Sequence, residues 1–195
     1  MGNGPPMGFN DEVRSLNGQF RQADTHIGLV AASLDLEQTR KIVELYNECG
    51  DWTTASEQWL EQRQAERLTV EGSRRSFNAI KPRLQEGGGG LPPLQYLPDI
   101  LDACRKERDQ LQVLYCYLVA EDSVVRYVLH EYLQQLERQS VGNLDFSNDQ
   151  IVDFLNDFQH ADGEPLDFAD STKDRWGTNF RSALRSIGVI QSKQG

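Results

Sequence analysis

The stretch DSVVRYVLHEYLQQLERQ, residues 122–139, carries apolar side chains that recur every three or four residues. This spacing places them along one face of a helix. The face consists of Val125, Val128, Leu129, Tyr132, Leu133 and Leu136. The stretch therefore predicts a long amphipathic helix that packs this face into a protein core.

Helical spacing of apolar residues continues on both sides of this stretch. It predicts further helices at 35–49, 54–67, 69–82, 94–103, 105–119 and 147–159, and a last one from Ser171 to Gly188. Trp59 is expected to anchor the second of these helices by being buried. No strong strand pattern precedes the last few residues, so the sequence predicts an all-α fold.

The clearest break in the chain is EGGGGLPPL at residues 86–94. Glycines followed by prolines form a connector that is first flexible and then stiff. The chain is therefore expected to contain two small helical subdomains. The predicted parts are a flexible N-terminal arm at 1–30, an N-terminal helical subdomain at 31–86, a Gly/Pro linker at 87–93 and a C-terminal helical subdomain at 94–195.

The composition favours a cytoplasmic protein. No apolar run approaches the roughly 20 residues that a membrane-spanning helix needs, and the N-terminus lacks the pattern of a secretory signal. The three cysteines, Cys49, Cys104 and Cys116, lack the spacing of a zinc site. We interpret them as reduced thiols and expect Cys116 to lie in the core.

No motif in the sequence indicates catalysis. The histidines His26, His130 and His160 are isolated from one another, and DGEPLDFAD at 162–170 lacks the spacing of a calcium loop. The glycine run at 87–90 lacks the Lys-Ser/Thr of a phosphate-binding loop. We therefore predict no catalytic residue, no metal site, no cofactor and no small-molecule substrate, so the protein is not expected to be an enzyme.

Two basic islands interrupt a chain whose net charge is -10. Residues 63–84 hold six basic residues against two acids, and residues 171–195 hold five against one. These basic residues are Arg63, Arg67, Arg74, Arg75, Lys81 and Arg83 in the first island and Lys173, Arg175, Arg181, Arg185 and Lys193 in the second. Acidity argues against a nucleic-acid partner only when the charge is spread evenly, and here it is not.

The second island has the pattern of an amphipathic helix. Its apolar face holds Trp176, Phe180, Ala183, Leu184 and Ile187, and the opposite face holds Arg175, Thr178, Asn179, Arg181, Ser182, Arg185 and Ser186. Small polar side chains between arginines allow a helix to approach phosphates closely. The alternative is that the basic residues only complement the helix dipole or form a solvated face.

The ends of this helix suggest a known arrangement. Ser171 and Asp174 form an S-x-x-D capping pattern at its start. Gly188 is expected to stop the helix, and VIQSK at 189–193 is expected to begin a short strand. A helix, a glycine turn and a strand with a basic tip are typical of the end of a winged helix-turn-helix, so the C-terminal subdomain is expected to be of this kind.

Three segments resemble the BrxA family, the small helical component of BREX phage-defence systems. They are RKIVELYNECGDWTTASEQWLEQ at 40–62, TVEGSRRSFNAIKPRL at 69–84 and STKDRWGTNFRSALRSIGVI at 171–190. The match covers roughly residues 36–190 and rests on the order and spacing of these segments. The resemblance implies a non-enzymatic cytosolic accessory protein, encoded beside a DNA methyltransferase, an alkaline-phosphatase-like protein and an ATPase.

The same resemblance implies binding to double-stranded DNA. Carried over by position, the matching residues are Arg74, Arg75, Arg83, Lys173, Arg175, Arg181 and Arg185. Among them, we expect Arg181 and Arg185 to be the strongest contacts, because they lie one helical turn apart opposite the apolar face. The alternative function is a protein-interaction adaptor whose acidic surface docks onto other BREX subunits without contacting DNA.

Overall fold

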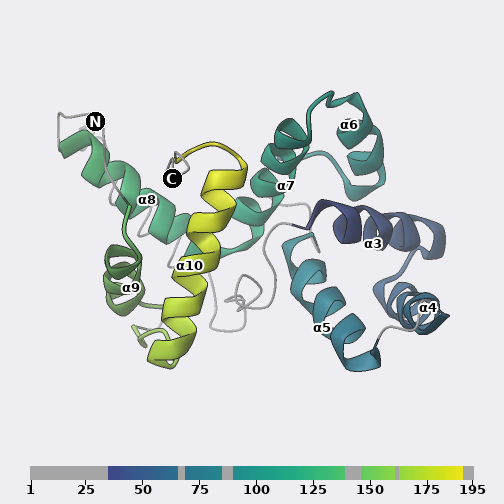
Figure 1. Cartoon of the computed structure of the whole chain (residues 1–195), viewed down its shortest axis with the longest axis horizontal. Helices are drawn as coiled ribbons and strands as arrows, with labels where there is room; N and C mark the ends of the chain where they lie inside the picture. The colour runs from purple at the N-terminus through teal and green to yellow at the C-terminus, as the bar shows by residue number, and fades with distance from the viewer. Residues whose placement is uncertain (1–34, 66–68, 85–89, 139–145, 161–162, 191–195) are drawn as a thin grey trace, which may run out of the picture.

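The computed structural model describes residues 35–65, 69–84, 90–138, 146–160 and 163–190. These residues form eight α-helices and two short 3-10 helices (Figure 1). The α-helices are α3 (Leu36–Cys49), α4 (Trp52–Ala65), α5 (Val70–Ile80), α6 (Leu97–Ala103), α7 (Glu107–Glu121), α8 (Ser123–Arg138), α9 (Asn148–Asp157) and α10 (Asp170–Ser186), and the 3-10 helices are η2 (Lys81–Arg83) and η3 (Leu94–Tyr96).

The all-α prediction is confirmed. Within the described ranges the only β-type pairing is an isolated bridge between Gln159 and Pro165. In the same residues, no helix combines the length and the apolar character needed to cross a membrane.

Local capping explains why several of these helices begin and end where they do. The Asp35 carboxylate accepts a hydrogen bond of 2.9 Å from the Gln38 amide at the start of α3, and Gly50 ends that helix with a positive φ of 75°. At the start of α8, Asp122 Oδ1 accepts from the amides of Val124 and Val125 at 2.9 and 3.0 Å. These caps satisfy amide groups that have no partner within the helix.

The first hydrophobic core lies among α3, α4, α5, α6 and one face of α7. Its central residue is Trp59, which is fully buried and donates a 2.8 Å hydrogen bond from Nε1 to the Ser73 carbonyl. The Arg63 guanidinium lies over the Trp59 ring, 4.8 Å from the ring centroid. The expectation that Trp59 anchors its helix by burial is confirmed.

The second core lies among α8, α9, α10 and the other face of α7. Trp176 and Phe180 of α10 stack at 5.0 Å between ring centroids, and Phe180 meets the edge of Phe146. Helix α7 belongs to both cores, since Leu114 lies in the first and Leu118 in the second. It is the structural connection between them, as its central position in Figure 1 shows.

The first core includes residues on both sides of the predicted Gly/Pro linker. Leu97 and Leu101, which follow that linker, pack in the first core together with Ile42. The proposed subdomain boundaries stay a prediction, and the N-terminal arm at 1–30 lies outside the described residues.

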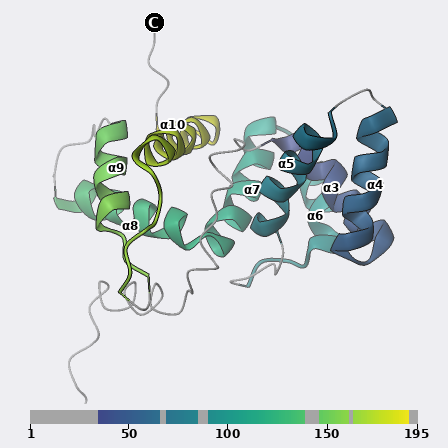
Figure 2. The same cartoon turned by 90° about the horizontal axis from the view of Figure 1, so that it is seen from below.

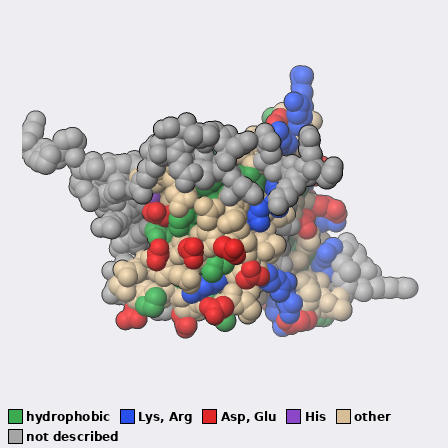
Figure 3. Space-filling view, turned by 60° about the vertical axis from the view of Figure 1, so that its left-hand side comes forward, with side chains coloured by type: hydrophobic (Ala, Val, Ile, Leu, Met, Phe, Trp, Pro, Cys, Tyr) green, Lys and Arg blue, Asp and Glu red, His purple; other side chains and the backbone are tan. Residues whose placement is uncertain are grey.

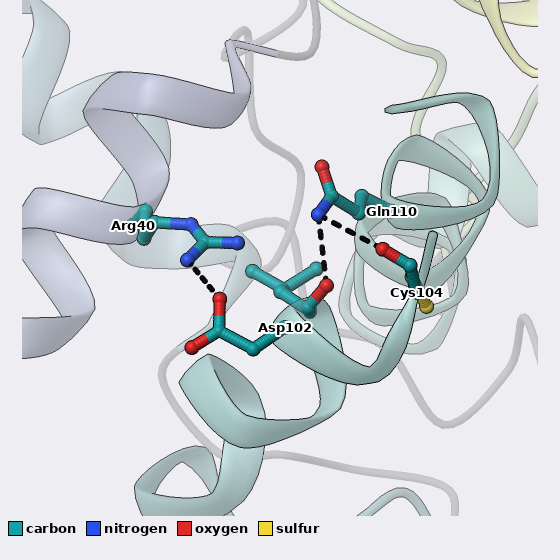
Figure 4. Close-up of polar contacts among 5 residues, drawn as sticks. Arg40, Asp102, Cys104 and Gln110 are labelled. Atoms are coloured by element: carbon teal, nitrogen blue, oxygen red, sulfur yellow. Dashed lines mark hydrogen bonds and ion pairs between the residues drawn. The ribbon is translucent and has the colours of Figure 1, made fainter. Parts of the chain in front are cut away.

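Helix α6 is fastened to its neighbours by polar contacts (Figure 4). Gln110 of α7 donates from Nε2 to the Leu101 carbonyl at 2.8 Å and to the Cys104 carbonyl at 3.3 Å. The Leu101 carbonyl, in the last turn of α6, also accepts from the Cys104 amide at 3.2 Å, and the Cys104 carbonyl follows the end of the helix. Arg40 of α3 forms an ion pair with Asp102 of α6. Helices α3, α6 and α7 are therefore joined by polar contacts as well as by the core.

Two expectations about buried residues were wrong. Cys116 is exposed, because it lies on the side of α7 that faces away from both cores. Leu133 is 47% exposed, because it lies about 80° around the helix from Val125, at the edge of the apolar stripe. The side chain of Leu136 lies outside the described residues.

Candidate nucleic-acid interface

Helix α10 presents the second basic island on the outside of the second core. It packs against α9 and buries Trp176, Phe180 and Leu184. In Figure 2, α10 lies on the opposite side of this half of the molecule from α8. The apolar face predicted for this helix is therefore confirmed, and the opposite face is turned toward solvent.

A glycine allows α10 to approach α9 closely. A Cβ atom on Gly177 would lie only 2.4 Å from Asn148 Oδ1 of α9. Asn148 in turn donates from Nδ2 to Asp174 Oδ1 at 2.5 Å and to the Asp174 carbonyl at 3.3 Å. Because Asp174 is the only acid between Ser171 and Ile190, this contact directs that charge toward α9.

The start of α10 differs from the sequence prediction. The helix begins at Asp170 with Ala169 as its N-cap residue, and no side chain caps it. The Ala169 carbonyl instead accepts hydrogen bonds from the amides of Thr172 and Lys173 at 2.8 and 3.0 Å. The predicted Ser171–Asp174 capping pattern is wrong, because Asp174 is bonded to α9.

The end of α10 is capped by side chains of α7. Arg108 donates from Nε to the Ile187 carbonyl and from Nη2 to the Gly188 carbonyl, both at 3.1 Å. Gln112 Nε2 donates to the same Ile187 carbonyl at 2.8 Å. A cation at this position also complements the negative end of the helix dipole. Val189 and Ile190 form a bend where a strand was expected, and residues 191–195 lie outside the described ranges.

Gly188→Ala is expected to lower the free energy of unfolding by about 1–3 kcal/mol, because Gly188 has a φ of 77°. Its new Cβ atom would also lie 1.6 Å from Arg108 Nη2 and displace that cap. Gly163→Ala is the matched control, since Gly163 has a φ of 86° but open space around its Cβ position. Denaturant unfolding should show the larger loss for Gly188→Ala, and equal losses would argue against the Arg108 cap.

The solvent face of α10 has an ordered arrangement of side chains. Ser171, Thr178 and Ser182 are exposed and lie within about 20° of a common line along the helix. Arg175, which is exposed, and Arg185, which is half-buried, lie about 40° to either side of that line. We call these five residues the α10 stripe: small hydroxyl side chains occupy its centre and guanidinium groups flank it.

The other two basic residues of α10 lie off the α10 stripe, and Lys173 lies about 160° from its centre, on the side that contacts α9. Arg181 is half-buried and lies about 80° from the centre of the stripe. Lys173 is also half-buried, and its Nζ donates to Asn156 Oδ1 of α9 at 2.8 Å. Arg175 and Arg185 therefore lie closer to the centre of the α10 stripe than Arg181 and Lys173 do.

The first basic island is exposed on α5. Arg74 and Arg75 are both exposed, and Arg75 Nη2 lies 3.7 Å from Glu71 Oε1 one turn earlier. Exposed pairs of this kind contribute about 0–1 kcal/mol, so Arg75 remains available to another anion. Helix α5 packs in the first core and α10 in the second, so the two basic islands belong to different parts of the fold.

Arg83 differs from the other predicted contacts, because the structure places it inside the protein. It is only 5% exposed. Burial lowers the pKa of Arg83 to about 10, while the carboxylates of Asp122 and Asp35 act in the opposite direction. A phosphate cannot reach this guanidinium in the folded protein, so Arg83 is not part of the surface interface.

The two histidines in the described ranges lie in separate environments. His130 Nδ1 lies 3.4 Å from Glu131 Oε1, and the His160 ring meets the edge of Phe158 at 5.2 Å between centroids. The described residues contain no group of three potential metal ligands. His26 lies outside these residues, and the absence of a metal site stays a prediction.

Comparison with protein families decides the identity of the chain. A model of the BrxA family matches residues 26–195, which is most of the sequence. The chain belongs to the BrxA family. The resemblance seen in three separate segments is thus confirmed, and the BrxA match contains both basic islands. Membership in the BrxA family implies a component of a BREX defence system. No curated protein was found to match the sequence.

Proposed function

We propose that this BrxA-family protein is a non-enzymatic, cytoplasmic DNA-binding component of a BREX system. Its ligand is double-stranded DNA, and its contacts lie on α10 and α5. The proposed contact residues are Arg74, Arg75, Lys173, Arg175, Arg181 and Arg185. The α10 stripe is the observation that carries this proposal.

The chemistry of the α10 stripe suits a duplex. Serine and threonine hydroxyls at its centre can hydrogen-bond phosphate oxygens at close range, and the flanking arginines can pair with phosphates or with guanine edges in the major groove. Single strands are usually held by stacking bases on exposed aromatic rings. The aromatic residues of α10, Trp176 and Phe180, are instead fully buried.

The acidic remainder of the surface supports a local interface. On the face shown in Figure 3, acidic side chains are numerous and most of the visible basic ones gather toward one side. Helix α9, next to α10, exposes Asp149, Asp153 and Asp157. These carboxylates repel phosphate, so a duplex is confined to the basic helices.

Duplex binding is expected to fall steeply with salt, since each neutralised phosphate contributes about -0.9 to the slope of log K against log salt. With about five phosphates neutralised, affinity should fall by about 10²–10³-fold between 50 and 200 mM salt. A fluorescence titration with a labelled duplex of arbitrary sequence measures this slope. An absence of binding at both salt concentrations would contradict the proposal.

The acidic face of α9 favours a second candidate, an adaptor that docks other BREX subunits. In that case the protein would cause no mobility shift of duplex DNA but would co-purify with a subunit. Replacement of Asp149, Asp153 and Asp157 with Asn would then abolish co-purification. Under the DNA-binding proposal, the same change should leave duplex affinity unchanged or raise it, because it removes like-charge repulsion beside α10.

A further inference from the structure

Arg108 of α7 is an exposed arginine whose guanidinium lies against the end of α10. Its Nε and Nη2 atoms donate to the carbonyls of Ile187 and Gly188, both at 3.1 Å. The Gly188 amide in turn donates to the Arg185 carbonyl at 3.0 Å. Arg108 therefore lies next to the last turn of α10, which carries Arg185, and Figure 1 shows this end of α10 beside α7.

No carboxylate neutralises the charge of Arg108 within the residues that the structure describes, because it forms no ion pair there. A guanidinium has five N–H donors, so the two bonds to α10 leave three of them unused. The carbonyls at the end of a helix carry only about half an elementary charge. Part of the positive charge of Arg108, and most of its donors, are therefore available to an anion from outside the protein.

The surroundings of Arg108 leave room for such an anion. The next residues on its side of α7 are Leu111 and Gln112, three and four positions later, and neither is an acid. Glu107 and Asp109 lie about 100° to either side of Arg108 around the helix axis. The acids of α10 are confined to its first five residues, at the opposite end of that helix. An anion that approaches the end of α10 thus meets Arg108 before it meets a carboxylate of either helix.

We propose that Arg108 is a further phosphate contact of the duplex, which extends the α10 interface onto α7. This inference rests on the proposed function. Arg175 and Arg185 flank the α10 stripe, and Arg108 adds a third arginine at the end of the same helix. Planar guanidinium groups pair well with phosphate oxygens. Arg108 thus caps α10 and also binds the backbone of the duplex that α10 approaches.

The test is the salt dependence of duplex affinity for Arg108→Gln in the full chain, measured with a labelled duplex of arbitrary sequence. Glutamine keeps an amide donor but carries no charge. We expect affinity at about 50 mM salt to fall on the order of 10-fold, and the slope of log K against log salt to lose about 0.9. Arg108→Lys should keep a slope close to that of the parent, because it keeps the charge.

Two matched variants separate a phosphate contact from the cap and from overall charge. Gln112→Ala removes the other side-chain donor to the Ile187 carbonyl, at 2.8 Å, without changing the charge. It should lower the melting temperature and leave the slope unchanged. Arg105→Gln removes the same charge from an exposed residue just before α7, and its effect on the slope should be clearly smaller than that of Arg108→Gln.

An unchanged slope for folded Arg108→Gln would overturn the contact. A reduction just as large in Arg105→Gln or in Gln112→Ala would overturn it as well, because overall charge or the cap would then account for the effect. Failure of the parent to bind duplex would instead overturn the proposed function, so the two failures are distinguishable.

If Arg108→Gln does not fold, modification of arginines in the parent by phenylglyoxal supplies a second measurement. A saturating amount of the duplex should slow modification of Arg108 more than that of Arg105, as read by mass spectrometry of the peptides. Equal slowing at the two residues, or no slowing at Arg108, would overturn the contact.

Discussion

Replacement of Arg175 and Arg185 with glutamate is expected to weaken duplex binding by at least about 100-fold at low salt. These side chains flank the α10 stripe, so the change removes two cations and places two anions where phosphates would lie. The fold should persist, because substitutions of exposed or half-exposed charges usually change stability by less than about 0.5 kcal/mol each. Affinity is measured by titration and folding by the melting temperature.

Two matched variants separate charge from shape at these positions. Arg175→Lys/Arg185→Lys keeps both charges, so it should retain most of the salt dependence while losing the bidentate contacts of arginine. Arg175→Ala/Arg185→Ala should reduce the slope of log K against log salt by about two units if each residue neutralises one phosphate. If the folded Glu variant binds duplex as tightly as the parent, α10 is not the DNA-binding element.

Trp59→Ala is expected to have the largest effect on stability. Trp59 is fully buried in the first core, and its truncation leaves a cavity and removes the hydrogen bond to the Ser73 carbonyl. Changes of this kind cost about 3–5 kcal/mol. In a protein of this size, that corresponds to a fall in melting temperature on the order of 10 °C.

Trp52→Ala is the control for this prediction. Trp52 begins the same helix and stacks on Tyr46 at 4.1 Å between centroids, but it is only half-buried. Its truncation should cost clearly less than that of Trp59, because less apolar surface is lost. A melting temperature of Trp59→Ala equal to that of the parent would contradict the central role of Trp59 in the first core.

The sequence determined the helices of this protein, because helix formation depends on local spacing and on local capping groups. The predicted helix at 147–159 appears as α9, and the last predicted helix appears as α10. The apolar face of α10 was also predictable, since a period of about 3.6 residues fixes which side chains share a side. The BrxA family was recognisable for a related reason, because the resemblance rests on short contiguous segments of the sequence.

The tertiary structure decided which of these side chains meet solvent. Arg83 belongs by sequence to the same basic island as Arg74 and Arg75, yet it is buried. The carboxylates that act on its pKa, Asp122 and Asp35, are distant along the chain. Asp174 looked like a cap and is bonded to Asn148 of α9. Helical periodicity gives the angle at which a residue lies around the axis of its helix. Burial depends on which other helices pack against that side. That information lies in long-range contacts, which no local pattern contains.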